Sequence, residues 1–247
     1  MRTGLNIFLL LTIVIVYNSC NDPEAFDCFK SAGDHSFEER AVDSYKYIIL
    51  STGVDVSFSD DQTETIKVEG PANLLSKIET TVYRDTLYIT DQNTCSWVRS
   101  PVETKIHIPI QPEINILYEG YGEIELNTSN DIDLFSLTVK DGMGDMDINF
   151  ANVKAASISN NSFSNINMTG KADSLHVYYS NNFGHFDASQ LLVQNLDLRY
   201  SGKNDAKINP EVKLTGLIYG FGNVISINSP DEVSVEEIST GKLIFQN

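Results

Sequence analysis

The stretch "EGYGEIELN", Glu119–Asn127, decides the fold, because similar phrases return about every twenty residues along the chain. "DGMGDMDINF" (Asp141–Phe150), "SNNFGHFDAS" (Ser180–Ser189) and "YGFGNVISIN" (Tyr219–Asn228) follow it. Each phrase is a short turn followed by alternating apolar and polar residues. Aligned at the residue before the turn, the units are marked by Gly120, Gly142, Ser162, Asn182, Gly202, Gly220 and, more weakly, Ser239. This period indicates a solenoid in which each unit forms one coil and stacks on the previous coil.

The alternation after each turn predicts strands with one buried side and one solvated side. Two apolar columns form the expected core: Ile124, Met146, Ile166, Phe186, Ala206 and Val224, then Leu126, Ile148, Met168, Ala188 and Ile208. A polar ladder is expected on the solvated side: Glu123, Asp145, Asn165, His185 and Asp205. Coils of about 20 residues favour a parallel β-helix over a propeller, whose blades need about 40.

Large apolar residues share one position in the turns. They are Tyr121, Met143, Phe163, Phe183 and Phe221, and Lys203 interrupts the column. An aromatic ladder of this kind packs on itself and supports the stack. If the same side chains point outward, they offer a platform for sugar rings. We expect packing, but the turn position by itself leaves the direction open.

The part of the chain before the repeats is also rich in strand signals. Residues 45–58 and 65–70 contain β-branched and aromatic residues with a period of two, and residues 80–90 predict a hairpin across Arg84 and Asp85. Only residues 71–78 suggest a helical turn. The chain is therefore predicted to be all-β. Residues 41–115 form an N-terminal β region, either of irregular coils or as a separate cap, and residues 116–247 form the regular coils.

The N-terminus has the pattern of a secretory signal. Arg2 precedes the apolar run Ile7–Val16, which is too short to span a bilayer, and "YNSC" follows. Cys20 in this context resembles the lipidated cysteine of bacterial lipoproteins, so residues 1–19 are the predicted signal peptide and residues 20–40 a lipidated tether. The alternative is an ordinary signal peptide with a chance cysteine. The expected location is the cell envelope, on the surface or periplasmic side of the outer membrane, with the lipid on Cys20 as anchor.

The net charge limits the possible binding partners, and the number of cysteines indicates whether a disulfide can form. The chain holds 17 Lys and Arg against 34 Asp and Glu, a formal net charge of −17, which disfavours nucleic acid and anionic lipid as partners. In an oxidising compartment Cys28 and Cys95 remain as an even pair and predict a disulfide, with two free thiols as the alternative. No metal-binding spacing such as CxxC is present.

Residues with catalytic chemistry do not form a recognisable set. Asp145, Asp147, His185 and Asp187 share a predicted face, but about two coils separate the pairs, a gap of about 10 Å. A single cation cannot bridge that gap. A GxSxG nucleophile motif and a phosphate-binding loop before a helix are also missing. The sequence thus predicts no catalytic residues, no metal and no cofactor.

The order of segments resembles a known family. "VDSYKYIILSTGVDVSF" (Val42–Phe58), "IKVEGPANLLSKIETTVYRDTLYIT" (Ile66–Thr90), "IHIPI" (Ile106–Ile110) and the Gly-x-Gly coils follow the rhythm of the "putative auto-transporter adhesin, head GIN domain" lipoproteins of Bacteroidetes. "DCFKSAG" and "TCSWVRS" look like a lipoprotein subgroup of it. The resemblance implies a right-handed parallel β-helix, similar in outline to pectin-lyase-like proteins. It implies adhesion but carries no binding residues to transfer.

Three functions are therefore compared. The leading hypothesis is a non-enzymatic envelope lipoprotein, an adhesin or binding scaffold that displays an extended β-helix face to a glycan or a protein. The first alternative is a polysaccharide lyase or hydrolase that uses the acidic face. The second is a structural envelope protein that assembles through its coil ends, where Leu243, Ile244 and Phe245 leave an apolar edge. The sequence leaves the oligomeric state open.

Overall fold

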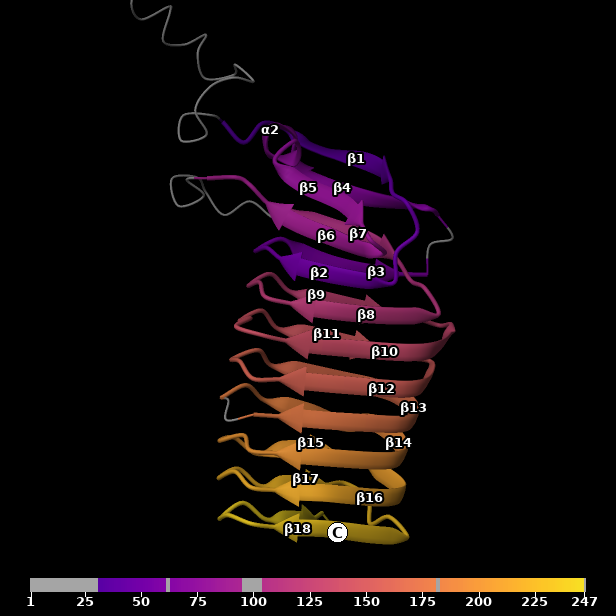
Figure 1. Cartoon of the computed structure of the whole chain (residues 1–247), viewed down its shortest axis with the longest axis vertical. Coiled ribbons are helices and arrows are strands. Elements are labelled where there is room, and N and C mark those ends of the chain that lie inside the picture. Colours follow the sequence, from indigo (N-terminus) through magenta and orange to yellow (C-terminus); the bar gives the residue numbers. More distant parts are fainter. Residues whose placement is uncertain (1–30, 61–62, 95–103, 181–182, 247) are drawn as a thin grey trace, which may run out of the picture.

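The structure is a computed structural model that describes residues 31–60, 63–94, 104–180 and 183–246. The predicted solenoid is confirmed: the chain winds into flat coils of parallel strands stacked along one long axis (Figure 1). The coils wind in the right-handed sense that connections between parallel strands almost always take. Among the described residues the one helix is the single turn α2 (Ala72–Leu75), and no helix is long and apolar enough to cross a membrane.

Each regular coil contributes one strand to each of two parallel sheets that enclose the core. We call them the long sheet and the short sheet after the lengths of their strands. The long sheet contains β2 (Tyr47–Ser51), β8 (Glu113–Tyr118), β10 (Asp131–Val139), β12 (Asn152–Asn160), the second halves of β13 (Ile166–Tyr179) and β14 (Phe186–Tyr200), β16 (Pro210–Ile218) and β18 (Glu232–Glu237). The short sheet contains β3 (Asp55–Ser59), β9 (Ile124–Asn127), β11 (Met146–Asn149), the first halves of β13 and β14, β15 (Ala206–Ile208), β17 (Val224–Ser226) and β19 (Leu243–Phe245).

The core lies between the two sheets, and both predicted apolar columns are confirmed. Each member of the two columns is at most 2 % exposed. The pairing register places Ile124, Met146 and Ile166 directly beside one another on successive coils. The long sheet supplies the opposite wall, where the ring of Phe135 meets that of Phe150 edge to face at 5.2 Å. Alternation by two residues therefore fixes which side of every strand is buried.

The first coil of the chain is not the first coil of the stack. Strand β2 pairs with β8 on one side and with β6 (Thr86–Asp91) on the other, and β3 likewise lies between β9 and β7 (Lys105–Pro109). The later coil β6–β7 thus lies above the earlier coil β2–β3, as Figure 1 shows. The N-terminal β region therefore contains regular parallel coils stacked out of chain order.

Antiparallel strands close the N-terminal end of the stack. Strand β1 (His35–Ala41) pairs with β4 (Thr65–Pro71), which pairs with β7, and β5 (Ile78–Tyr83) pairs with β6. The predicted hairpin is confirmed in β5–β6, where Arg84 and Asp85 adopt positive φ of 47° and 61° as a tight hairpin turn requires.

The predicted tether at residues 20–40 is wrong for its last part, because residues 35–40 belong to β1. This strand has no steady apolar period, since it lies at the edge of the sheet with both faces largely exposed. Its backbone hydrogen bonds with β4 hold it, and those bonds carry no sequence signal. A short charged edge strand of this kind also blocks further strand pairing.

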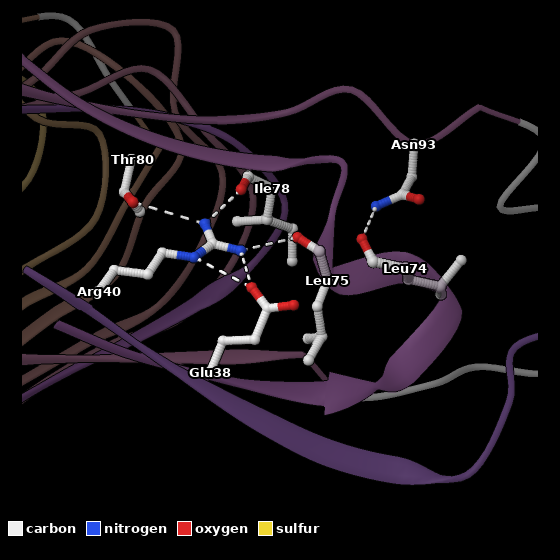
Figure 2. Close-up of polar contacts among 7 residues, drawn as sticks. All are labelled: Glu38, Arg40, Leu74, Leu75, Ile78, Thr80 and Asn93. Atoms are coloured by element: carbon white, nitrogen blue, oxygen red, sulfur yellow. Dashed lines mark hydrogen bonds and ion pairs between the residues drawn. The ribbon is translucent and has the colours of Figure 1, made fainter. Parts of the chain in front are cut away.

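Arg40 fastens this end of the molecule (Figure 2). Its guanidinium donates hydrogen bonds to the carbonyl oxygens of Ile78 and, at 2.9 Å, Leu75, and it forms an ion pair with Glu38 at 2.7 Å. Nearby, the side-chain amide of Asn93 donates to the carbonyl of Leu74 at 3.1 Å. One side chain on β1 therefore satisfies the carbonyl groups that end α2 and begin β5.

Replacing Arg40 with methionine should loosen this end while leaving the coils intact. The change leaves the Leu75 and Ile78 carbonyls without their donor, and each loss costs about 1–3 kcal/mol. Hydrogen exchange should accelerate in β1 and β5 and stay unchanged in β12. Lys140→Met is the matched control, because its ion pair with Glu119 is exposed and of small value. Equal protection of β1 in both variants would contradict this role of Arg40.

Candidate functional site

In the repeated turn, three successive residues point inward, outward and inward. This arrangement determines which side chains are displayed on the surface. In the turn of the coil that starts at Gly142, Gly142 and Gly144 are buried and Met143 between them is exposed. A Cβ atom on Gly144 would lie 1.9 Å from the carbonyl oxygen of Gly122 in the coil above. The turns of these two coils are thus stacked so closely that no side chain fits at Gly144. Other described coils place Thr52, Val54, Ser162, Ser164 or Asn204 at the inner positions. The middle residue must then point into solvent.

Buried polar side chains brace the turns from inside. The hydroxyl of Tyr118 donates to the carbonyl of Gly122 at 2.6 Å, and the amide of Asn160 donates to the carbonyl of Ser164 at 3.0 Å. Tyr200 donates in the same way to the carbonyl of Asn204. Burial raises the pKa of both tyrosines, so they remain neutral donors over the ordinary pH range. Each brace satisfies a turn carbonyl that water cannot reach.

The exposed middle residues form one continuous row, which we call the aromatic ridge. Its large apolar side chains are 51–68 % exposed: Tyr121, Met143, Phe163, Phe183 and Phe221. The rings of Phe163 and Phe183 stack at 5.9 Å with an angle of 2° between their planes. Lys203 interrupts the apolar row, but its ammonium lies 4.1 Å from the centre of the Phe183 ring and continues the contact. The direction that the sequence left open is therefore outward, and the expected packing is limited to contacts along the row.

The ridge ends on a residue that sequence reasoning missed. Pairing of β2 with β8 places Gly53 at the ridge position of the neighbouring coil. A Cβ atom on Gly53 would lie 1.8 Å from a ring carbon of Tyr121, so the Tyr121 ring covers the Gly53 backbone. The repeat did not reveal Gly53, because its coil stacks out of chain order.

Carboxylates border the ridge on both sides. Glu119 and Asp141 are exposed just before the ridge residues of their coils, and Glu123, Asp145 and Asp205 are exposed just after. In a chain with a net charge of −17, this border gives the ridge a negative surround. The ridge is therefore apolar along its crest and acidic along its sides.

The predicted polar ladder lies on the outer face of the short sheet, and all five of its members are exposed. Several of its side chains link successive coils. Asn165 donates to Asp145 at 2.9 Å and accepts from the backbone N–H of His185 at 2.9 Å, and Asp205 accepts from the backbone N–H of Asn223 at 2.7 Å. The ladder thus uses much of its hydrogen-bonding capacity to hold the coils in register.

The carboxylates of Asp147 and Asp187, on the outer face of the short sheet, are paired with nitrogen donors, whereas a cation would need oxygen ligands. The carboxylate of Asp147 accepts from the amide of Asn167 at 3.1 Å, and that of Asp187 pairs with Lys207 at 2.9 Å. Among the described residues, no group of three or more His, Cys, Asp or Glu side chains is placed to hold a metal ion. Two further histidines pair away from this face, His176 with Asp197 at 3.6 Å and His107 with Glu69 at 3.2 Å.

The remaining predicted residues are the three cysteines and the apolar residues of the last strand. The lipid-attachment residue Cys20 and the disulfide pair Cys28 and Cys95 fall outside the described residues, so their roles stay predictions. Leu243, Ile244 and Phe245 form β19, and Ile244 is 43 % exposed. Within the described part of the chain, β19 pairs with β17 alone, so its outer edge is open there.

Fold and site together define a right-handed parallel β-solenoid with a repeated, outward-facing apolar edge. Residues 44–230 match the family model described as "putative auto-transporter adhesin, head GIN domain", and the chain belongs to this family. The sequence resemblance is therefore confirmed.

Solved structures of bacterial proteins share the fold. A putative adhesin from Bacteroides fragilis superposes with a TM-score of 0.75 at 19% identity, covering 86% of this chain and 97% of that chain. A putative lipid binding protein from Parabacteroides distasonis has a TM-score of 0.59 at 16% identity, with 87% and 98% covered. A putative adhesin from Parabacteroides merdae has a TM-score of 0.57 at 15% identity, with 87% and 97% covered. No curated protein matches the chain.

Proposed function

We propose that this protein is a non-enzymatic adhesin of the cell envelope that contacts a protein partner through the aromatic ridge. The lipid on Cys20 holds it to the outer membrane with the solenoid facing outward. The observation that carries the proposal is the row of large apolar side chains, each at least half exposed, on one edge of the solenoid. Membership in a family described as an adhesin supports it. Exposed apolar patches on soluble domains commonly mark interaction sites.

The ridge is preorganised for binding. Backbone hydrogen bonds join successive turns, from Met143 N–H to the Gly120 carbonyl at 2.9 Å and from Tyr121 N–H to the Thr52 carbonyl at 3.0 Å. The inner glycines leave the turns no room to shift inward. Little conformational freedom is then lost when the ridge contacts a partner, which favours affinity. Aromatic side chains also supply much of the binding energy at protein interfaces.

The chemistry of the ridge points to the kind of partner. A convex apolar row fits an apolar groove, and the carboxylates beside it favour a groove with a basic rim. The acidic border and net charge repel phosphate-rich surfaces. The partner we propose is therefore a protein surface with an apolar groove flanked by lysine or arginine.

Removing the ridge should abolish adhesion. Cells that carry the triple variant Phe163→Ser, Phe183→Ser, Phe221→Ser should adhere to a host-cell or matrix-protein layer at least about tenfold less than cells with the native protein. The matched control is the double variant Phe37→Ser, Tyr83→Ser, which removes rings of similar exposure away from the ridge. Blotting after protease treatment of intact cells reports whether each variant faces outward. Unchanged adhesion of the ridge variant, or full protection from external protease, would refute the proposal.

A further inference from the structure

The outer face of the long sheet contains a shallow hollow away from the ridge. Its volume is about 390 Å³, within the range of small-molecule sites. Strands β6, β2, β8 and β10 supply its outward-facing side chains: Thr86, Tyr47, Ile49, Asn115, Leu117, Ser136 and Thr138. Tyr47 is 54 % exposed and lies between Thr86 and Asn115 in the strand register.

The strand register shows how the surface continues past the β10 side of the hollow. One column of outward side chains runs from Tyr47 and Asn115 through Ser136 and Ser157 to His176. The neighbouring column runs from Ile49 and Leu117 through Thr138 and Ser159 to Tyr178. In both columns small hydroxyl residues on β10 and β12 lie between larger residues on either side. The small side chains of β12 therefore extend the low surface one strand beyond the hollow, whose lining reaches β10.

Four hydroxyl groups lie on this low surface: Ser136 and Thr138 line the hollow, and Ser157 and Ser159 lie beside it on β12. Across the part of the chain that the structure describes, none of the four forms a hydrogen bond with another protein group. Each is partly or fully exposed, so each can donate and accept. They form a grid of two by two, with neighbours about 4.8 Å apart between strands and about 6.6 Å apart along a strand.

These features together favour a sugar. Free hydroxyls in a grid complement the hydroxyls of a pyranose ring, and Tyr47 offers a flat apolar face to its C–H groups. The lining contains no carboxylate, ammonium or guanidinium group. The net charge of −17 further disfavours anionic ligands. We propose that this hollow binds a segment of a neutral oligosaccharide.

This site is independent of the proposed adhesive function. The ridge follows the turns between the two sheets, whereas the hollow lies on the outer face of the long sheet. Sugar binding should therefore persist in the ridge variant and should be measurable with the purified full-length protein in the absence of cells.

Calorimetric titration with neutral pentasaccharides tests the proposal. Cellopentaose, maltopentaose, mannopentaose and chitopentaose are the neutral probes, and an oligogalacturonate is the anionic comparison. We expect at least one neutral probe to bind with a Kd in the micromolar to low millimolar range, and the oligogalacturonate at least about tenfold more weakly. Ser136→Gln fills the hollow and should weaken binding by at least about tenfold, as should Tyr47→Ala.

Ser234→Gln is the matched control, because Ser234 lies in the same side-chain column as Ser136 but at the far end of the sheet. It should leave binding unchanged, and so should the triple ridge variant. The proposal is overturned if no neutral probe binds at about 10 mM, if Ser136→Gln binds as tightly as Ser234→Gln, or if the oligogalacturonate binds equally well.

Discussion

Replacing Gly144 with alanine should lower the free energy of unfolding by about 3 kcal/mol or more. The added methyl group would lie 1.9 Å from the Gly122 carbonyl oxygen and 2.3 Å from the Tyr118 hydroxyl. The first neighbour is backbone, which cannot move without separating two coils. The second is the hydroxyl that braces the Gly122 turn. A single methyl group therefore strains the turn stacking and breaks a buried hydrogen bond.

The adjacent residue provides the matched control for this substitution. Met143→Ala changes the same turn by a larger number of atoms, yet Met143 is 64 % exposed and should cost less than about 1 kcal/mol. Chemical unfolding monitored by circular dichroism measures both variants. If Gly144→Ala unfolds at the same denaturant concentration as Met143→Ala, the turns are not packed as closely as the structure indicates.

Stability should fall steeply above pH 10, by about 5 kcal/mol per pH unit when all four buried tyrosines contribute. The tyrosines are Tyr45, Tyr118, Tyr179 and Tyr200, which are at most 7 % exposed. Burial raises the pKa of Tyr45 to about 12 and raises that of the other three further. An unfolded tyrosine titrates near pH 10.

The sign of the effect follows from these pKa values. Between pH 10 and pH 12 the unfolded chain loses phenolic protons that the folded protein keeps, so rising pH favours unfolding. Above pH 10 each buried tyrosine lowers the free energy of unfolding by up to about 1.4 kcal/mol per pH unit. The stability that its burial in the neutral form provides is fully present below pH 10. A domain of ordinary stability, about 5–15 kcal/mol, should therefore unfold before pH 13.

Urea unfolding at several pH values, with tyrosinate absorbance recorded in parallel, tests this. The four buried tyrosines should ionise only as the fold is lost. Tyr200→Phe should reduce the slope by about one quarter, because it removes one of the four buried phenols. Ionisation of the four buried tyrosines near pH 10, with the fold retained, would contradict their burial.

The candidate site was only partly predictable from the sequence. Its membership could be deduced, because the repeat places Tyr121, Phe163, Phe183 and Phe221 at one turn position. The direction in which these side chains point could not be deduced. A residue in a turn follows neither the two-residue period of a strand nor the 3.6-residue period of a helix, and those periods are what distinguish buried from exposed positions. The close approach of Gly144 to the Gly122 carbonyl decides it, and that approach exists only once the coils are stacked.

The sequence by itself determined the coil length, the buried columns such as Ile124, Met146 and Ile166, and the family. These features depend only on the spacing of residues along the chain, because side chains alternate between the two faces of a strand whatever its neighbours are. Only the tertiary structure decided that β2–β3 lies beneath β6–β7, that residues 35–40 form an edge strand, and that Ser136 and Thr138 line a hollow. The physical reason is that backbone hydrogen bonds between strands are alike for every residue, so the order of strands depends on distant contacts that no local pattern records.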